Sequence, residues 1–301
     1  MLSYLVFIAT IGGVYTLLAL SLNLIWGSVG MVNLGLAGFF AVGAYASAIL
    51  TTMGKGPIPL GLVLALGVGA LAGLLATFST KRLRDDYLAI VTLGFAEVVR
   101  LVAQNEIWLT RGADGISGIP GPFKSALGPD FNAFYLALTM AIVGVVYLLL
   151  RRIDASPYGR ALRAIREDPQ VAAVAGKNVM RFKTEAFALS AAIAGLAGAL
   201  YGHFTSYIAP DLFQPLITVY IFLAVTAGGT GRPSGALLGA FLVVFFLEST
   251  RFVVEFVPGV TPLRASALRE ALIGVALLVV LRLRPQGLLP ERIRPAPKGT
   301  S

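Results

Sequence analysis

Ionisable side chains inside long apolar runs are the first candidates for chemistry in this chain. Glu97 and Arg100 are three residues apart, while Arg251 follows Glu248 by three residues and precedes Glu255 by four. These spacings place opposite charges on one face of a helix, where they can neutralise each other. Each group is therefore either a structural ion pair between packed helices or, through Glu97 or Glu248, part of a substrate path or a proton relay.

The chain lacks the residue types that most enzyme sites need. It has no cysteine, which excludes disulfides, thiol catalysis and cysteine-bound metals. Its single histidine, His203, can build neither a His-His metal site nor a Ser-His-Asp triad. No phosphate-binding Gly-x-x-x-x-Gly-Lys-Ser/Thr motif occurs. We therefore expect no catalytic residue, metal or cofactor, and if ATP drives this protein, another subunit must bind it.

The segment 151–183 differs from the rest of the chain because it is long, basic and helix-prone. It holds eight Lys or Arg residues against Asp154, Glu167 and Asp168. A Lys or Arg at the centre of a bilayer costs roughly 2.5–3.5 kcal/mol, so this segment is predicted to be a cytoplasmic loop.

Two short helices are expected within this loop. Ser156-Pro157 is typical of a capped helix start, and Pro169 and Gly176 bracket a second, apolar turn. The helical spacing leaves one face charged and the other apolar, able to insert into a groove of another protein. Alternatively, the helix lies on anionic lipid.

The elements that must position these residues are membrane spans. The chain is 57% hydrophobic and only 13% charged, which indicates an all-α polytopic membrane protein with about 8–10 transmembrane helices in one domain, residues 1–301. About 20 apolar residues cross the bilayer. That length predicts nine spans, at about 3–26, 29–53, 58–79, 85–104, 132–150, 184–208, 215–230, 235–257 and 267–284.

Two of these spans carry residues that favour a break. The second contains Asn33 and several glycines, and the seventh is short and ends in Gly228-Gly229-Thr230-Gly231, so either could be broken or re-entrant. Glycines also recur four residues apart, which favours close helix packing. Such pairs are Gly69 and Gly73, Gly198 and Gly202, Gly231 and Gly235, and Gly235 and Gly239.

The basic residues predict an orientation. With the N-terminus outside and the C-terminus inside, 17 of the 24 Lys and Arg residues fall on the cytoplasmic side and five on the outer side. The cytoplasmic tail is then about 285–301. Because the basic residues gather in short loops and this tail, we expect no nucleic-acid partner. The outer loop 105–131 is rich in Gly and Pro and is either a connector or a contact for whatever delivers substrate.

Blocks distributed over most of the chain resemble one family, the inner-membrane permease subunits of branched-chain amino acid ABC importers of the LivM-like kind. The blocks are Leu83–Phe95, Gly115–Pro120, Ser156–Asp168, Gly176–Val179 and Ala194–Leu200. Permeases of this broad class carry Glu-Ala-Ala, three residues and Gly in their coupling loop. With Gly176 at the end, Gln170-Val171-Ala172 stand at those first positions, so the role of the Glu cannot be carried over.

The resemblance implies a bacterial inner-membrane subunit that moves branched-chain or related amino acids. It also implies four protein partners: a second permease in a heterodimer, two cytoplasmic ATPases and a periplasmic or extracellular binding protein. The lipid bilayer surrounds the two permeases. The 151–183 loop would grip an ATPase. The residues expected to couple to the ATPase are Tyr158, Gly159, Arg160, Arg163, Arg166, Glu167, Asp168, Ala172 and Gly176.

Residues of the translocation path are open to more than one interpretation. Candidates are Asn23, Asn33, Phe39, Tyr45, Glu97 and Glu248, although packing explains the polar and aromatic ones equally well. A self-contained proton-coupled carrier of small amino acids or amides, using Glu97 or Glu248, is the main alternative function. A scaffold protein that carries no solute is a third. The sequence does not decide among branched-chain amino acids, other amino acids, urea and short amides.

Overall fold

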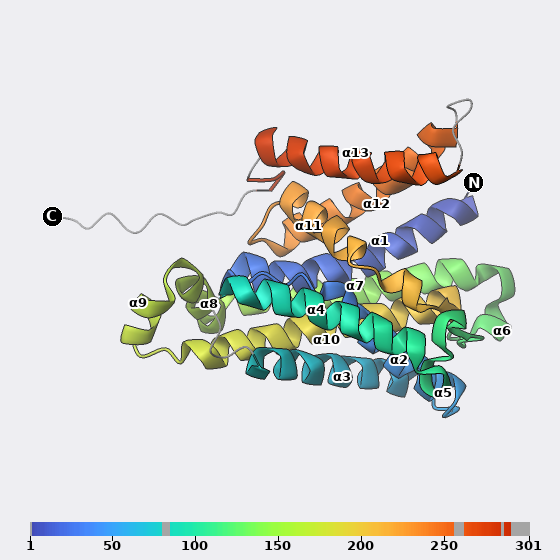
Figure 1. Cartoon of the computed structure of the whole chain (residues 1–301), viewed down its shortest axis with the longest axis horizontal. Helices are drawn as coiled ribbons and strands as arrows, with labels where there is room; N and C mark the ends of the chain where they lie inside the picture. The colour runs from blue at the N-terminus through green and yellow to red at the C-terminus, as the bar shows by residue number, and fades with distance from the viewer. Residues whose placement is uncertain (1, 80–84, 256–261, 284–285, 290–301) are drawn as a thin grey trace.

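The computed structural model describes residues 2–79, 85–255, 262–283 and 286–289 as a bundle of long helices (Figure 1). The long helices are α1 (Leu2–Leu22), α2 (Leu36–Thr52), α3 (Ile58–Ser79), α4 (Asp85–Asn105), α7 (Phe131–Ala155), α10 (Val179–Thr205), α11 (Leu216–Gly228), α12 (Pro233–Glu255) and α13 (Pro262–Leu283). The predicted all-α polytopic fold is confirmed, and each predicted span coincides with one of these helices.

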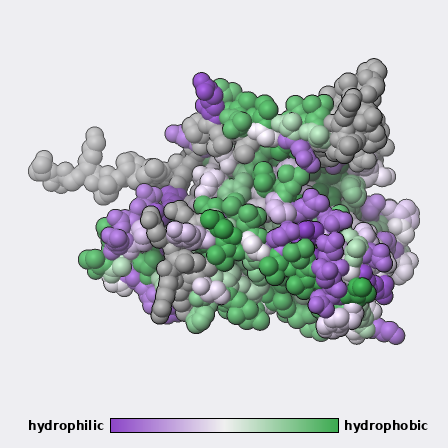
Figure 2. Space-filling model, in the orientation of Figure 1, coloured by the Kyte–Doolittle hydropathy of each residue, from purple (hydrophilic) through white to green (hydrophobic). Residues whose placement is uncertain are grey.

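Most of these helices have the length and apolarity that a membrane requires. Six helical stretches of the described chain are long and apolar enough to cross a bilayer, and α2 and α12 contain shorter apolar stretches. Figure 2 shows hydrophobic residues across the middle of the molecule, with hydrophilic residues gathered toward its two ends. The protein is a multi-pass membrane protein.

Helix α10 forms the centre of the bundle and packs against α1, α2 and α3. Its glycines make this possible, because a Cβ atom at Gly198 would overlap the carbonyl oxygen of Phe40 on α2. On α3, a Cβ atom at Gly69 would lie 2.6 Å from the carbonyl oxygen of Ala191 on α10. The close packing predicted from glycine spacing is confirmed at these positions, whereas Gly202 has a looser neighbour, 3.2 Å away.

The predicted break in the second span is also confirmed. Helix α1 continues into a π-helical turn, η1 (Asn23–Ser28), and residues 30–35 are not helical before α2 begins. Gly30 has φ +81°, a left-handed conformation that glycine adopts without strain. Helix α2 therefore starts inside the bundle, beside Thr92 of α4, whose hydroxyl accepts a hydrogen bond from the Leu34 amide at 3.1 Å.

The short elements lie at the two ends of the bundle (Figure 1). One end carries α8 (Pro157–Glu167) and α9 (Pro169–Val174). The other carries α5 (Ile107–Thr110), η2 (Gly112–Asp114), β1 (Ile116–Ser117), α6 (Lys124–Leu127), η3 (Gly128–Asp130), β2 (Tyr207–Ile208) and η4 (Pro210–Phe213). Strands β1 and β2 pair antiparallel, with Ile116 opposite Ile208, so the 105–131 loop is attached to the segment that follows α10.

Candidate functional site

Helices α8 and α9, here called the α8–α9 unit, begin with well-formed caps. The Ser156 hydroxyl accepts a hydrogen bond from the Gly159 amide at 3.3 Å, and Pro157 occupies the first turn. The Asp168 carboxylate accepts bonds from the amides of Gln170 (2.7 Å) and Val171 (3.1 Å) at the start of α9. The helix starts predicted at Ser156-Pro157 and Pro169 are confirmed. Because Asp168 caps α9, its carboxylate already has partners within the chain.

The apolar face of α8 lies against the bundle. Ala161, Leu162 and Ile165 are buried, and a Cβ atom at Gly159 would overlap the carbonyl oxygen of Ile153 at the end of α7. The expectation that this face inserts into a groove of another protein is therefore wrong, because the chain itself covers it. Ala172 on α9 is buried in the same way.

Two of the predicted coupling arginines fix the α8–α9 unit to the rest of the chain. Arg163 donates to the carbonyl oxygen of Asp154 at 3.1 Å and forms an ion pair with its carboxylate. Arg166 donates to the carbonyl oxygen of Gly27, at the end of η1, and pairs with Glu167 at 3.0 Å. The close approach of Arg166 also uses Gly30, where a Cβ atom would lie 2.9 Å from the arginine Cγ.

Tyr158 attaches the start of α8 to α10. Its ring lies 5.1 Å from the ring of Phe182, centroid to centroid. Burial, with smaller contributions from the Glu185 carboxylate, raises the pKa of Tyr158 to about 12, so the phenol stays neutral at physiological pH. Tyr158 is thus an anchor of the unit.

The surface of the α8–α9 unit that faces away from the bundle is partly apolar. Val171 and Val174 on α9 are 65% and 91% exposed, and Arg160 and Glu167 on α8 are also exposed. The turn after α9 closes at Gly176, which has φ +78°. Neither valine was among the predicted coupling residues. The available signal was the apolar turn between Pro169 and Gly176, which carries two valines three residues apart.

A joint beneath the α8–α9 unit connects three distant segments. The Asn23 side-chain oxygen of η1 accepts a hydrogen bond from the Gly231 amide, between α11 and α12, at 2.9 Å. In the same loop the carbonyls of Ala227 and Gly228 accept bonds, each 2.9 Å long, from Leu288 and Leu289. These leucines belong to the predicted tail 285–301, of which only Gln286–Leu289 is described.

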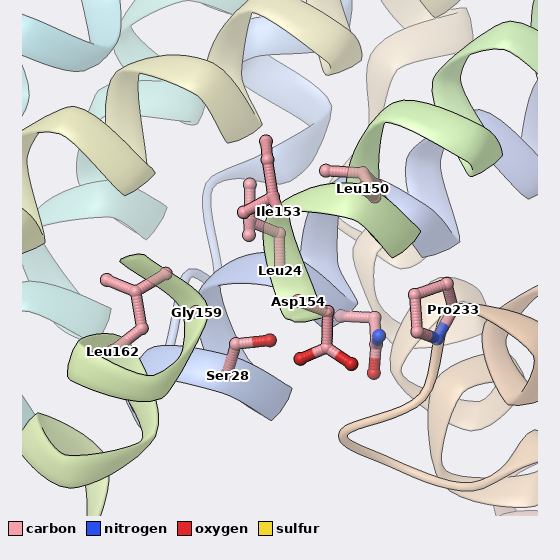
Figure 3. Close-up of a pocket in the computed structure, with 9 residues that line it drawn as sticks. Leu24, Ser28, Leu150, Ile153, Asp154, Gly159, Leu162 and Pro233 are labelled. Carbon is pink, nitrogen blue, oxygen red and sulfur yellow. The ribbon is translucent and has the colours of Figure 1, made fainter. Parts of the chain in front are cut away.

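A small pocket lies at this joint. It is lined by Asn23, Leu24, Ser28, Leu150, Ile153, Asp154, Gly159, Leu162 and Pro233. Figure 3 shows Asp154, from the end of α7, and Ser28, from η1, directed into the space that Pro233 borders. The cavity volume is about 10 Å³, roughly what one water molecule needs. This pocket is too small for an amino acid, so we interpret Asn23 as a structural link.

A second polar group, here called the α4 cluster, lies toward the α5–α6 end. Arg100 donates to Glu97 through Nε at 3.0 Å and Nη2 at 2.5 Å, which confirms the ion pair expected from their spacing. Its Nη1 lies 3.9 Å from the Asp211 carboxylate of η4. Tyr45 of α2 is beneath η4, with its ring 5.8 Å from that of Phe213. Arg100 therefore links Glu97 of α4 to Asp211 of η4, and Tyr45 packs against the same η4 segment.

The remaining path candidates lie apart from this cluster. Asn33 is fully buried at the break before α2, where its side-chain oxygen accepts from the Gly35 amide at 2.9 Å. Phe39 is also fully buried, stacked on Phe95 with ring centroids 4.8 Å apart. Glu248 accepts a hydrogen bond from the Tyr4 hydroxyl at 2.7 Å. The side chains of its expected neighbours, Arg251 and Glu255, lie outside the described part of the structure.

His203 is held within the bundle by two hydrogen bonds. Its Nε2 lies 2.8 Å from the Ser47 hydroxyl and its Nδ1 lies 2.7 Å from the Pro120 carbonyl, which ties α10 to α2 and to the 105–131 loop. Among the residues that the structure describes, no three His, Asp or Glu side chains gather as metal ligands would. The described features are thus a partly apolar exposed surface on the α8–α9 unit, the hydrogen-bonded link between η1 and the α11–α12 loop, and the α4 cluster.

Comparisons with known proteins identify the family of this chain. Residues 4–281 match the family model described as branched-chain amino acid transport system / permease component. The chain is 35% identical to the Salmonella typhimurium high-affinity branched-chain amino acid transport system permease protein LivM, over 94% of this chain and 69% of the relative. It is 28% identical to a probable LivM permease of Methanocaldococcus jannaschii, over 93% and 91% of the two chains.

A second kind of relative is more distant. The Escherichia coli high-affinity branched-chain amino acid transport system permease protein LivH is 25% identical over 93% of this chain and 92% of its own length. No solved structure gives a significant match. On the family match over nearly the whole chain, this protein belongs to the branched-chain amino acid transport permease family.

Proposed function

We propose that this chain is one permease subunit of an ATP-driven importer for branched-chain or related amino acids, forming the translocation path with a second permease and driven by two cytoplasmic ATPases. The observation that supports this most is the α8–α9 unit. It is fixed to the bundle by Arg163 and Arg166, yet it presents Val171 and Val174 outward. A rigid element with an apolar tip at the water-facing end of a membrane protein is suited to receive force from a soluble partner.

The contacts of Arg166 give this force a route into the bundle. Arg166 joins α8 to η1 at Gly27, and four residues earlier Asn23 of η1 joins the loop between α11 and α12 at Gly231. A displacement of α8 would therefore reach the broken α1–α2 connection and the start of α12 together. The ATPase can drive transport only through a differential interaction with two states of this unit, because a ligand shifts an equilibrium only by its difference in affinity.

The ATPase-facing surface is predicted to centre on the two valines of α9, with Arg160 and Glu167 at its rim. Replacing Val171 and Val174 together with serine should remove most ATPase that co-purifies with this chain, since buried apolar area drives such docking. Affinity purification from membranes, with the captured protein identified by mass spectrometry and its ATP hydrolysis measured, checks this. A loss of about tenfold or more is expected.

The matched control is Ala173→Ser, which alters an exposed residue of the same helix that lies between the two valines. This variant should retain the ATPase. Undiminished capture by the double valine variant, with the permease present in equal amount, would contradict the docking surface. If the wild-type chain also brought down no ATPase, the proposed function itself would fail.

In this proposal, the charges of the loops set the orientation of the chain in the membrane. The α8–α9 end is cytoplasmic, the N-terminus is outside and the membrane is the bacterial inner membrane. The α5–α6 end then faces outward, where a soluble binding protein would deliver the amino acid. The 105–131 loop, attached to β2 by strand β1, would be part of the surface that this binding protein meets.

The α4 cluster supports a translocation path along this helix. Glu97 lies eight residues before the end of α4, about 12 Å at 1.5 Å per residue, and its side chain is 41% exposed. A charged side chain at that depth faces protein or water far more cheaply than lipid. We therefore place the second permease, or a water-filled path between the two chains, over this face of α4.

A further inference from the structure

The α4 cluster contains one cation and two anions in a specific arrangement. Both carboxylate oxygens of Glu97 are engaged by Nε and Nη2 of Arg100, which fixes the guanidinium plane. The third nitrogen, Nη1, is turned toward Asp211 at 3.9 Å and toward the Gln104 side-chain oxygen at 3.4 Å. Both contacts are long, and the Asp211 side chain is 78% exposed. One nitrogen of the arginine and the Asp211 carboxylate are therefore only weakly engaged by the protein.

A buried polar atom without a hydrogen-bond partner lies under η4, the segment that carries Asp211. Tyr45 is only 6% exposed, and its hydroxyl has no hydrogen-bond partner among the described residues. The segment η4 covers it, with Phe213 against the tyrosine ring, and Asp211 and Tyr207 are within electrostatic range of the hydroxyl. Leaving a buried hydroxyl unpaired costs free energy, so this phenol calls for an explanation other than stability.

The chemistry of the cluster matches an α-amino acid. An amino acid carries its ammonium and carboxylate groups on one carbon, so its recognition needs an anion and a cation side by side. We infer that Asp211 binds the α-ammonium group and Arg100 the α-carboxylate of the transported amino acid, with the Tyr45 hydroxyl as a neutral hydrogen-bonding partner. This inference rests on the proposed function and deepens it, because it names the residues that bind the two charged groups of the amino acid. Glu97 acts as a positioning residue that orients Arg100.

Tyr45→Phe separates this role from a structural one. It removes the unpaired hydroxyl and keeps the ring against Phe213, so packing alone predicts an equal or slightly higher unfolding temperature and unchanged transport. A role in substrate binding instead predicts unchanged stability and about tenfold fewer leucine molecules imported per ATP hydrolysed. That factor is the effect of losing one hydrogen bond to a charged group. The measurement is leucine uptake and ATP hydrolysis by the complete importer in proteoliposomes, with saturating leucine-loaded binding protein.

Asp211→Asn and Arg100→Gln test the charged partners in the same assay. Each should lower leucine imported per ATP by about tenfold or more. Lys55→Gln, at an exposed lysine in the turn between α2 and α3 at the same end of the bundle, is the control and should leave the ratio unchanged. The affinity of the binding protein for the importer, measured by surface plasmon resonance, should be unaltered in all variants.

Two outcomes would overturn the inference. In the first, Asp211→Asn weakens capture of the binding protein while the leucine-to-ATP ratio stays normal, which would make Asp211 a protein-docking residue. In the second, Tyr45→Phe and Arg100→Gln both transport at the wild-type ratio. Failure of the proposed function is recognised separately, because the wild-type importer would then show no ATP-dependent leucine uptake before any variant is compared.

Discussion

Replacing Gly198 with alanine is expected to leave almost no folded protein in the membrane. The new methyl group would overlap the carbonyl oxygen of Phe40 and lie 2.8 Å from the Ala44 amide nitrogen, and both are backbone atoms of α2 that no rotamer change can move. Helices α2 and α10 would have to separate where their backbones are in contact. A loss of more than about 4 kcal/mol is expected, at the extreme end for one substitution.

The comparison variant is Gly144→Ala on α7, where an added Cβ atom meets nothing within 4 Å. Alanine there should be neutral or stabilise the helix by about 0.5–1 kcal/mol, since glycine weakens helix interiors. Size-exclusion chromatography in detergent and thermal unfolding of both variants check the pair. Equal yield and equal unfolding temperature for the two variants would show that the α2–α10 contact is not as close as described.

Replacing Arg166 with glutamine is expected to uncouple ATP hydrolysis from transport. The substitution removes the charged donor to the Gly27 carbonyl, and with it the described side-chain link between α8 and η1, while Leu162 and Ile165 still hold α8 on the bundle. Leucine uptake by the complete importer should fall by about 10- to 100-fold, the range of a coupling free energy of about 1.4–2.8 kcal/mol. ATPase subunits should still co-purify, and they should still hydrolyse ATP.

Arg152→Gln serves as the control for this prediction, because Arg152 is an exposed arginine at the end of α7. It removes the same charge near the same surface, so a purely electrostatic effect on the ATPase or on anionic lipid would appear in both variants. Coupled uptake at the wild-type rate in Arg166→Gln would contradict the route through η1. Loss of the ATPase from the purified complex would instead make Arg166 a docking residue.

The helices could be predicted from sequence because their signals are local. Twenty-residue apolar runs and caps such as Ser156-Pro157 depend on neighbouring residues, and the long helices and the two loop helices were expected from them. The ion pair of Glu97 and Arg100 was equally accessible, since residues three apart on a helix must meet. The break before α2 was expected from Asn33 and its glycines.

Contacts between distant segments could not be predicted in the same way. The amphipathic pattern predicts that the apolar face of α8 is covered, but only the fold shows that α7 and the bundle cover it. Asp211 follows Arg100 by more than a hundred residues, and its position depends on how η4 crosses α2 and α4. The link from Arg166 to Gly27 joins a charged side chain to a backbone carbonyl, which leaves no trace in the pattern of residue types.

The central claim is that the α8–α9 unit transmits the conformational change of separate ATPases to a helix bundle that does not itself hydrolyse ATP. The most direct test is leucine accumulation in proteoliposomes holding either the complete importer or this chain alone, with ATP or a proton gradient as the energy source. The account predicts accumulation only with the complete importer and ATP, and its loss in Arg166→Gln. Leucine accumulation by the isolated chain under a proton gradient, without any ATPase, would contradict it and identify a secondary carrier.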